Sequence, residues 1–172
     1  MEEEVKKIMN TRQLYRALWG NKVTKPFFDG VYARDTLEDI QNKPQLIICN
    51  THSSWKVGEH WLLFFFRPGK KPAEFFDSMG EPLESYGVEF VNFISRFSVH
   101  FKNTTKRYQP INSSLCGVYC LFYAYWCCRG MSMYDICLRM KSAKHVVKIV
   151  RKLFHLCTNK YLCKFLQCCN IL

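Results

Sequence analysis

Residues 109–128 read QPINSSLCGVYCLFYAYWCC, and this stretch changes from polar to apolar within a few residues. The N-cap residue types Asn-Ser-Ser stand just before Leu115 and Cys116, and no charged residue follows until position 129. Arg and Gly at positions 129–130 suit the end of a helix. The pattern predicts a buried central helix of about three turns that begins at Cys116.

Cys116 has two interpretations. At a helix N-terminus the positive end of the dipole favours the thiolate, which is the nucleophilic form of cysteine. Cysteine is also a small, frequently buried apolar residue, and it can occupy this position for packing alone. The remaining members of a catalytic site, if they are present in the sequence, separate the two interpretations.

A cysteine nucleophile needs a base and a group that orients the base. His60 stands at the start of an apolar run, and Asp77 follows the next apolar run after the turn Arg-Pro-Gly-Lys-Lys-Pro. Two strands in a hairpin bring both residues to one sheet edge, where Asp77 can accept a hydrogen bond from His60. Gln109, seven residues before Cys116, can donate to an oxyanion together with the backbone N–H of Cys116.

Trp61 follows His60 directly and also has two interpretations. It can pack in the core, or its ring can lie against the imidazole and favour the charged form by ~1 kcal/mol. Both can hold at once.

The segments Gly-Glu-His-Trp at 58–61, Phe-Asp at 76–77, Gln109 and Asn-Ser-Ser-Leu-Cys-Gly at 112–117 resemble adenain, the adenovirus-type processing protease. Close relatives are encoded by Polinton (Maverick) elements and by adintoviruses, and we expect this branch. The order and the gaps match, and Phe-Asp-Gly-Val-Tyr at 28–32 resembles a lead-in segment of the family. The resemblance spans about residues 28–128, extends in outline to the amino-terminal helix, and weakens after Gly130.

The resemblance implies an α+β fold with a mixed central sheet flanked by helices, as in adenain-like and ubiquitin-like-modifier proteases. It implies a cysteine endopeptidase in which His60, Asp77 and Cys116 are catalytic, Gln109 serves the oxyanion, and Trp61 and Gly117 support the site. The implied substrates are viral or mobile-element capsid and core precursors, cleaved after glycine during virion maturation. The implied location is the host nucleus and the virion.

Composition bounds these expectations. The chain has 172 residues, 48% of them hydrophobic, which predicts a single globular domain with a core over 28–130 and a basic helical part over 131–172. Three glutamates after Met1 do not resemble a signal peptide, so we expect an intracellular, reduced and monomeric protein despite its ten cysteines. Zinc-finger spacing is absent and no apolar run reaches ~18 residues, so neither a metal site nor a membrane span is expected.

The formal charge of +11 is uneven, because residues 129–172 hold nine of the 25 Lys and Arg but one of the 14 acids. A helix predicted over about 132–156 places five basic residues on one face: Lys141, Lys144, Lys148, Arg151 and Lys152. The face is either a solvated surface of a docked helix or a site for nucleic acid, most plausibly DNA bound without sequence preference.

The resemblance to adenain also implies how the enzyme could be activated. Adenain is stimulated by DNA and by a peptide that forms a disulfide with a cysteine before the oxyanion glutamine. This chain has Ser98 at the matching distance and no cysteine over 81–115. We therefore expect no covalent peptide cofactor, and we keep DNA as a candidate activator.

Other readings remain open. A protease of ubiquitin-like modifiers has the same order of site residues, and a DNA-binding module with a vestigial protease site is possible from the charge alone. The last four residues, Cys169-Asn170-Ile171-Leu172, formally match a prenylation box. Helices are also expected over 2–18 and 82–97. Strands are expected over 46–49, in the apolar run that starts at about residue 60, and in the apolar run that ends just before Asp77.

Overall fold

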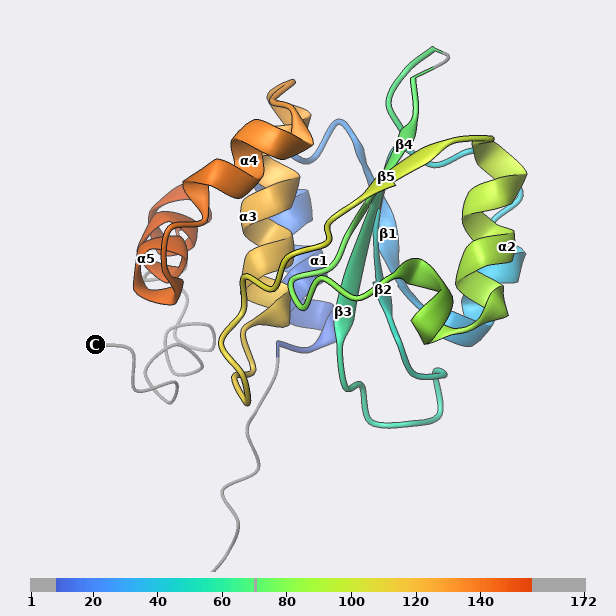
Figure 1. The fold of residues 1–172 in the computed structure, drawn as a ribbon, viewed down its shortest axis with the longest axis horizontal. Coiled ribbons are helices and arrows are strands. Elements are labelled where there is room, and N and C mark those ends of the chain that lie inside the picture. The colour runs from blue at the N-terminus through green and yellow to red at the C-terminus, as the bar shows by residue number, and fades with distance from the viewer. Residues whose placement is uncertain (1–8, 70, 156–172) are drawn as a thin grey trace, which may run out of the picture.

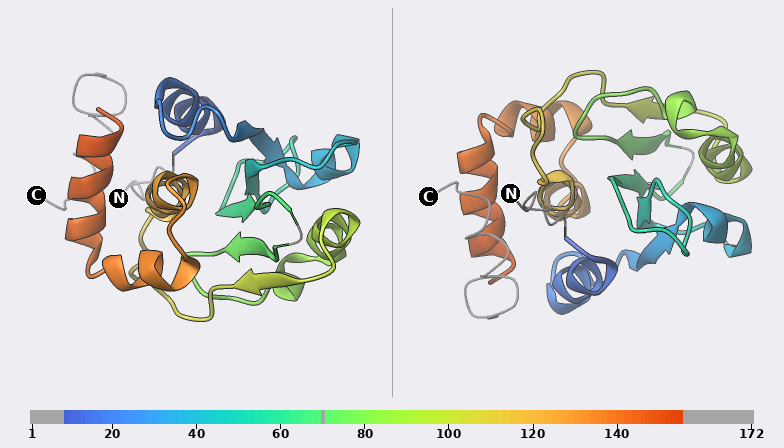
Figure 2. Two further views of the ribbon diagram at one scale, coloured as in Figure 1. Left: turned by 90° about the horizontal axis from the view of Figure 1, so that it is seen from above. Right: turned by 90° about the horizontal axis from the view of Figure 1, so that it is seen from below.

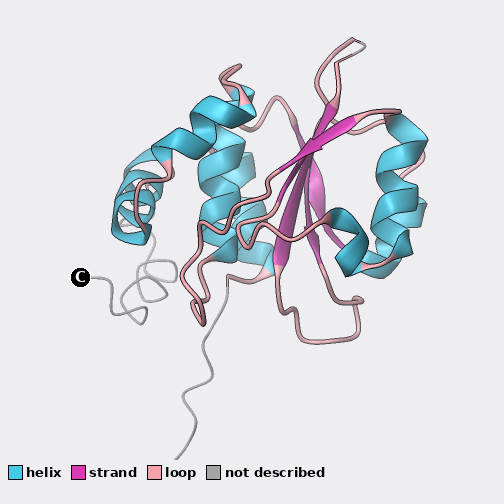
Figure 3. Cartoon of the chain, viewed as in Figure 1, coloured by secondary structure: helices cyan, strands magenta, loops and turns pink. Residues whose placement is uncertain are grey.

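The computed structural model describes residues 9–69 and 71–155. This part of the chain forms five strands, five α-helices and two short 3₁₀ segments, and the last three helices follow the last strand (Figures 1 and 3). The predicted prenylation box lies outside the described residues. None of the helices in the described ranges combines the length and the apolar character that crossing a membrane requires.

The five strands form one mixed sheet in the order β1-β2-β3-β4-β5. They are β1 (Phe28–Ala33), β2 (Leu46–Asn50), β3 (Trp61–Phe65), β4 (Ala73–Phe76) and β5 (Phe101–Asn103). The three central strands are antiparallel, and each outer strand is parallel to its neighbour. Every residue of β2, β3 and β4 is buried, which explains why these strands are continuous apolar runs in the sequence.

Side chains of the central strands alternate between two hydrophobic clusters, one on each face of the sheet. On one face Leu63 and Phe65 pack with the helices α1 (Thr11–Gly20), α3 (Cys116–Cys128), α4 (Met133–Arg139) and α5 (Ala143–Leu153). On the other face Leu62 and Phe64 pack with α2 (Val88–Phe97) and the 3₁₀ segments η1 (Arg34–Asp39) and η2 (Leu83–Tyr86). Figure 2 shows these layers from both ends. The α+β expectation is confirmed.

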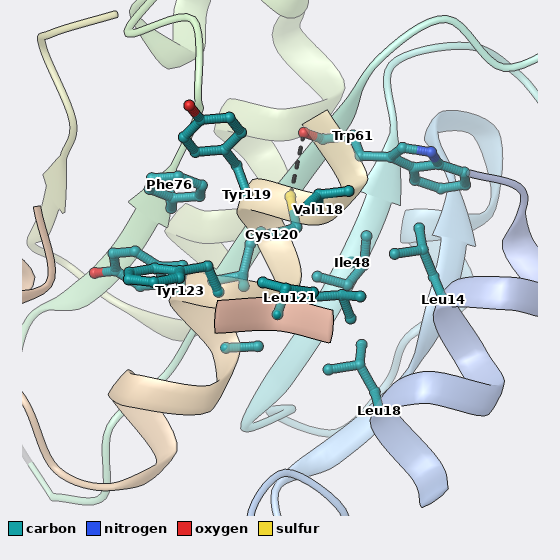
Figure 4. Close-up of a cluster of buried hydrophobic side chains, with 14 of the residues drawn as sticks. Leu14, Leu18, Ile48, Trp61, Phe76, Val118, Tyr119, Cys120, Leu121 and Tyr123 are labelled. Carbon is teal, nitrogen blue, oxygen red and sulfur yellow. Dashed lines mark hydrogen bonds between the residues drawn. The ribbon is translucent and has the colours of Figure 1, made fainter. Parts of the chain in front are cut away.

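Helix α3 lies between the sheet and α5, so it is covered on nearly all sides (Figure 2). Ten of its 13 residues are buried, and its side chains interlock with α1 and the sheet around Leu121 (Figure 4). Gly130, with φ of 83°, ends the helix as predicted. The predicted N-cap is wrong, because Leu115 occupies that position and has no side-chain cap.

Three predicted helices have different bounds. Helix α1 begins at Thr11, where Asn10 and Gln13 form a reciprocal capping box, and residues 2–8 of the predicted helix lie outside the described residues. The segment 82–97 divides at Gly87, whose φ of 124° ends η2 before α2 begins. The segment 132–156 divides into α4 and α5, because Ser142 caps a second helix after the chain leaves α4.

Candidate active site

His60 and Asp77 meet at one edge of the sheet. His60 immediately precedes β3 and Asp77 immediately follows β4, and the antiparallel pairing of Leu63 with Phe76 sets these two ends side by side. His60 Nε2 lies 2.6 Å from Asp77 Oδ1, and both residues are buried. The hairpin therefore produces the contact that the sequence pattern predicts.

The Asp77 carboxylate is fixed by donors on both oxygens. Oδ1 accepts from His60 and from the Met79 N–H at 3.0 Å, while Oδ2 accepts from the Glu81 N–H at 2.9 Å and the Tyr86 hydroxyl at 2.8 Å. Burial alone raises the pKa of Asp77, but the bond with His60 and the backbone donors outweigh it and lower this pKa below its usual value. Asp77 is therefore a fixed anion at neutral pH.

Cys116 is the first residue of α3, and its thiol is close enough to His60 to affect the pKa of the ring. His60 Nδ1 is buried and makes no hydrogen bond to another described residue. Burial lowers the pKa of His60, but Asp77 and Cys116 together outweigh burial and raise this pKa to about 9. The ring is therefore an imidazolium at neutral pH, with a carboxylate at Nε2 and a second nitrogen that no other described residue uses.

Gln109 enters the same site from the loop before α3. Its Nε2 donates to the Ser113 carbonyl at 2.7 Å, and its Oε1 accepts from the Ser78 hydroxyl at 2.8 Å. Its backbone N–H also donates to the Ser78 carbonyl at 3.0 Å. The amide is thus held between the residue next to Asp77 and the loop that leads to Cys116.

Tyr86 is a site residue that the sequence pattern does not reveal, because it falls inside the helix predicted over 82–97. It instead ends η2, where its ring stacks on His60 with centroids 5.9 Å apart. Burial, together with the charge and the hydrogen bond of Asp77, raises the pKa of Tyr86, so it remains a neutral donor. Gly87, directly after it, is the sequence signal for the helix break that makes this contact possible.

Trp61 and Gly117 contribute through packing. The Trp61 indole N–H donates to the Met9 carbonyl at 2.7 Å, and its ring lies in the cluster of α1 and α3 (Figure 4). The aromatic ring stacked on His60 is that of Tyr86, so the predicted imidazole contact of Trp61 is replaced by this one. A Cβ on Gly117 would lie 3.1 Å from Met9 Cβ, so glycine allows the start of α1 to approach α3 closely.

The loop that leads to His60 is held by polar contacts at several points. Asp35 accepts from the backbone N–H and the hydroxyl of Ser54, both at 2.7 Å. The ring nitrogens of His52 contact the Val57 carbonyl and the Glu59 carboxylate, both at 2.8 Å. These contacts fix the loop that leads to His60.

The predicted basic residues lie on α5 and in the connection before it. Lys144, Lys148 and Lys152 are exposed along α5, Arg151 is half-buried on it, and Lys141 is exposed in the connection before it. The opposite face of α5 buries Val146, Val147 and Val150, as the sequence predicts. Among the described residues, no group of three or more His, Cys, Asp or Glu side chains is arranged to hold a metal ion.

The fold, compared with solved structures, is similar to that of known cysteine proteases. No family model and no curated protein matches the sequence. The ASFV pS273R protease aligns with a TM-score of 0.54 and 16% identity over 90% of this chain and 73% of its own. The SUMO protease Ulp1 in complex with SMT3, the yeast ortholog of SUMO, aligns with a TM-score of 0.52 and 14% identity over 92% of this chain and 80% of its own. The chain thus has the fold of the Ulp1-like cysteine proteases, a mixed sheet flanked by helices.

Proposed function

We propose that the protein is a cysteine endopeptidase in which Cys116, His60 and Asp77 form the catalytic triad. The observation that carries this proposal is a single imidazole whose Nε2 lies 2.6 Å from the Asp77 carboxylate, whose Nδ1 is buried without a hydrogen bond, and whose pKa is raised in part by the nearby Cys116 thiol. The shared fold with cysteine proteases supports it. The Tyr86 and backbone bonds to Asp77 hold its carboxylate in the position from which it orients His60.

The chemistry follows from the two sides of the ring. The Cys116 thiolate attacks the scissile carbonyl, a C–S bond forms, and the electron pair moves to the carbonyl oxygen. When the intermediate collapses, the C–N bond breaks and His60 gives its Nδ1 proton to the leaving amine. His60 then accepts a proton from water as that water hydrolyses the thioester. Asp77 keeps the ring oriented throughout and stabilises its charged form.

The oxyanion site consists of Gln109 and the Cys116 backbone N–H. Cys116 begins α3 after an N-cap residue that has no capping side chain. The N–H groups of a first helical turn have no intrahelical acceptor, so they are suited to stabilise a developing negative charge. Gln109 adds a side-chain donor from the loop that leads into α3.

The proposed substrates are proteins cut after glycine, with viral or mobile-element capsid and core precursors as the class. The enclosure of the site supports a glycine preference, because Cys116 is 1% exposed and His60 is 4% exposed. A scissile segment with side chains next to the cut bond meets the surrounding walls, whereas glycine does not. The capsid class rests on the sequence resemblance alone.

A second candidate is removal of ubiquitin-like modifiers, favoured by the fold shared with Ulp1, whose structure was solved with SMT3. Both activities cut after glycine, so the two differ in the rest of the substrate, which is a folded modifier in one case and a structural precursor in the other. Cleavage of a folded modifier precursor but not of unstructured glycine-containing peptides would favour this second candidate.

We further propose that the basic face of α5 binds DNA. Lys144, Lys148, Arg151 and Lys152 have no ion-pair partner among the described residues, and α5 itself carries no acidic residue. Clustered cations without compensating acids favour a polyanion. DNA bound here is a candidate activator.

The test of the protease activity uses the full chain and a library of glycine-containing peptides. The parent should cleave, and Cys116→Ser should not, because a serine hydroxyl is not ionised by His60 at neutral pH. Cys120→Ser is the matched control, since Cys120 lies one turn along the same helix with its thiol on the Trp61 carbonyl. Equal cleavage by parent and Cys116→Ser would exclude Cys116 as the nucleophile.

A further inference from the structure

Ser78 is a fully buried residue with three hydrogen bonds to the loop segment Tyr108–Gln109. Its hydroxyl donates to Gln109 Oε1 at 2.8 Å. Its carbonyl accepts the backbone N–H of Gln109 at 3.0 Å and that of Tyr108 at 2.9 Å. One residue therefore fixes both the backbone and the side chain of Gln109.

The contacts of Gln109 decide which way its amide points. The Ser113 carbonyl can only accept a hydrogen bond, so the amide end that lies 2.7 Å from it must be Nε2. The other end is then Oε1, and Ser78 must be the donor to it. An amide nitrogen carries two hydrogens, and the Ser113 carbonyl takes one of them. Nε2 therefore has a second hydrogen that the Ser113 carbonyl does not take.

We propose that Ser78 is a positioning residue of the oxyanion site. Its hydroxyl holds the Gln109 amide in the orientation that presents the second Nε2 hydrogen to the oxygen of the tetrahedral intermediate. This inference rests on the proposed cysteine-protease function. Free rotation of the amide would present Oε1 for part of the time, and an acceptor facing a developing oxyanion opposes the reaction.

The position of Ser78 next to Asp77 links the oxyanion site to the catalytic base. Asp77 and Ser78 are consecutive residues at the end of β4, and their side chains contact His60 and Gln109 respectively. Thr104 holds the backbone of this dipeptide, because its hydroxyl contacts both the N–H and the carbonyl of Asp77, at 3.0 and 2.8 Å. The end of one strand therefore orients both the base and the oxyanion donor.

The first test measures peptide hydrolysis by Ser78→Ala in the full chain. Loss of a complete oxyanion donor lowers kcat about 10²–10³-fold, so loss of its positioning should lower kcat about tenfold or more with KM changed less than about twofold. Alkylation of Cys116 by iodoacetamide forms no oxyanion, so its rate should match the parent. Thr24→Ala is the control, because it removes another buried hydroxyl bond, 2.6 Å to the Leu18 carbonyl, and should leave kcat unchanged.

Ser78→Cys provides a second variant that keeps the volume of the site while weakening the donor. It should also lower kcat, and this holds even if Ser78→Ala folds poorly. An unchanged kcat in Ser78→Cys and in a folded Ser78→Ala would overturn the inference.

The double variant with Gln109→Ala tests whether Ser78 acts through Gln109. If it does, adding Ser78→Ala to Gln109→Ala should lower kcat by less than about twofold further. A further loss of about tenfold would contradict the inference, since it would assign Ser78 an independent role. A parent that shows no Cys116-dependent hydrolysis would instead refute the proposed function, and this result is distinct from an active parent that is insensitive to Ser78.

Discussion

Tyr86 contacts two members of the proposed triad through different parts of one side chain. Its hydroxyl donates to Asp77 Oδ2 at 2.8 Å, and its ring stacks on His60. A hydrogen bond to a charged acceptor contributes about 1.5–3 kcal/mol, while the ring restricts imidazole movement. The two effects can be separated by removing only the hydroxyl.

Tyr86→Phe should therefore lower kcat several-fold and leave KM nearly unchanged. Asp77 loses one of its donors in this variant, and the stacked ring remains. Tyr32→Phe is the control, because the Tyr32 hydroxyl makes only an exposed 3.5 Å contact with the Asp29 carbonyl. Steady-state peptide hydrolysis by both variants provides the comparison, and equal kcat values would limit Tyr86 to packing.

At the level of elements, the contact between α1 and α3 depends on a residue without a side chain. A Cβ at Gly117 would lie 3.1 Å from Met9 Cβ and 3.4 Å from Leu14 Cδ2, whereas a Cβ at Gly20 would meet nothing within 4 Å. Both glycines lie in helices. Gly117→Ala should lower the free energy of unfolding by about 1–3 kcal/mol through overpacking.

Gly20→Ala is the matched control and should be neutral or slightly stabilising, because alanine favours a helix over glycine. Urea unfolding of both variants measures the difference. A Gly117→Ala variant as stable as Gly20→Ala would show that α1 shifts to accommodate the added methyl group without loss of unfolding free energy.

The basic face of α5 provides a second prediction for an element. Replacing Lys144, Lys148 and Arg151 with alanine should weaken binding to duplex DNA and reduce the salt dependence of the affinity, because each phosphate contact releases condensed counterions. The control replaces Lys43, Lys71 and Lys102, three exposed lysines outside α5, with the same change in charge. Equal binding by both triple variants would assign the DNA affinity to net charge rather than to α5.

The bounds of the helices show which parts of the fold the sequence pattern can predict. The apolar run to Cys128 predicted α3, since a helix apolar on all sides needs only to be buried. The breaks after Tyr86 and Arg139 were missed, because each depends on local backbone conformation. Gly87 has a positive φ that a helical stripe does not reveal, and Ser142 competes with continuation of α4 by capping α5.

The candidate site shows the same division. The sequence predicted the contact of His60 with Asp77, because strand pairing follows from the hairpin. It did not predict Tyr86 or Ser78, because these residues reach the site through a 3₁₀ segment and a loop whose course depends on the tertiary fold. Gln109 was predicted although it lies in a loop, because the family resemblance supplied it, whereas Tyr86 and Ser78 had no such signal.

On the scale of the whole molecule, the ion pair makes stability depend on pH. The pKa of His60 is raised to about 9, so its stabilising contribution is complete below its unfolded value of about 6.5 and is lost as pH rises through about 9. The pKa of Asp77 is lowered, so its contribution is lost only in acid. The pair therefore stabilises the fold most between about pH 4 and 6.5.

Asp77→Asn should consequently cost more stability near pH 6 than near pH 10, by at most a few kcal/mol, since one pKa unit corresponds to about 1.4 kcal/mol. Urea unfolding of parent and variant at both pH values measures this. A pH-independent difference would show that Asp77 stabilises the fold through its backbone donors and not through His60.

The chain provides internal controls for the central claim, that Cys116 is an activated nucleophile. Cys49, Cys120 and Cys127 are buried, and burial raises the pKa of each of these thiols well above its ordinary value. Their modification in the folded protein should be slow. All ten cysteines can be followed separately by mass spectrometry of peptides.

The most direct measurement is the rate of iodoacetamide alkylation at each cysteine in the parent, in His60→Gln and in Asp77→Asn at neutral pH. Cys116 should react far faster than Cys49, Cys120 and Cys127 in the parent, and it should slow by about tenfold or more in His60→Gln and by a smaller factor in Asp77→Asn. Slow alkylation of Cys116 in the folded parent, or a rate that does not change in His60→Gln, would contradict the account.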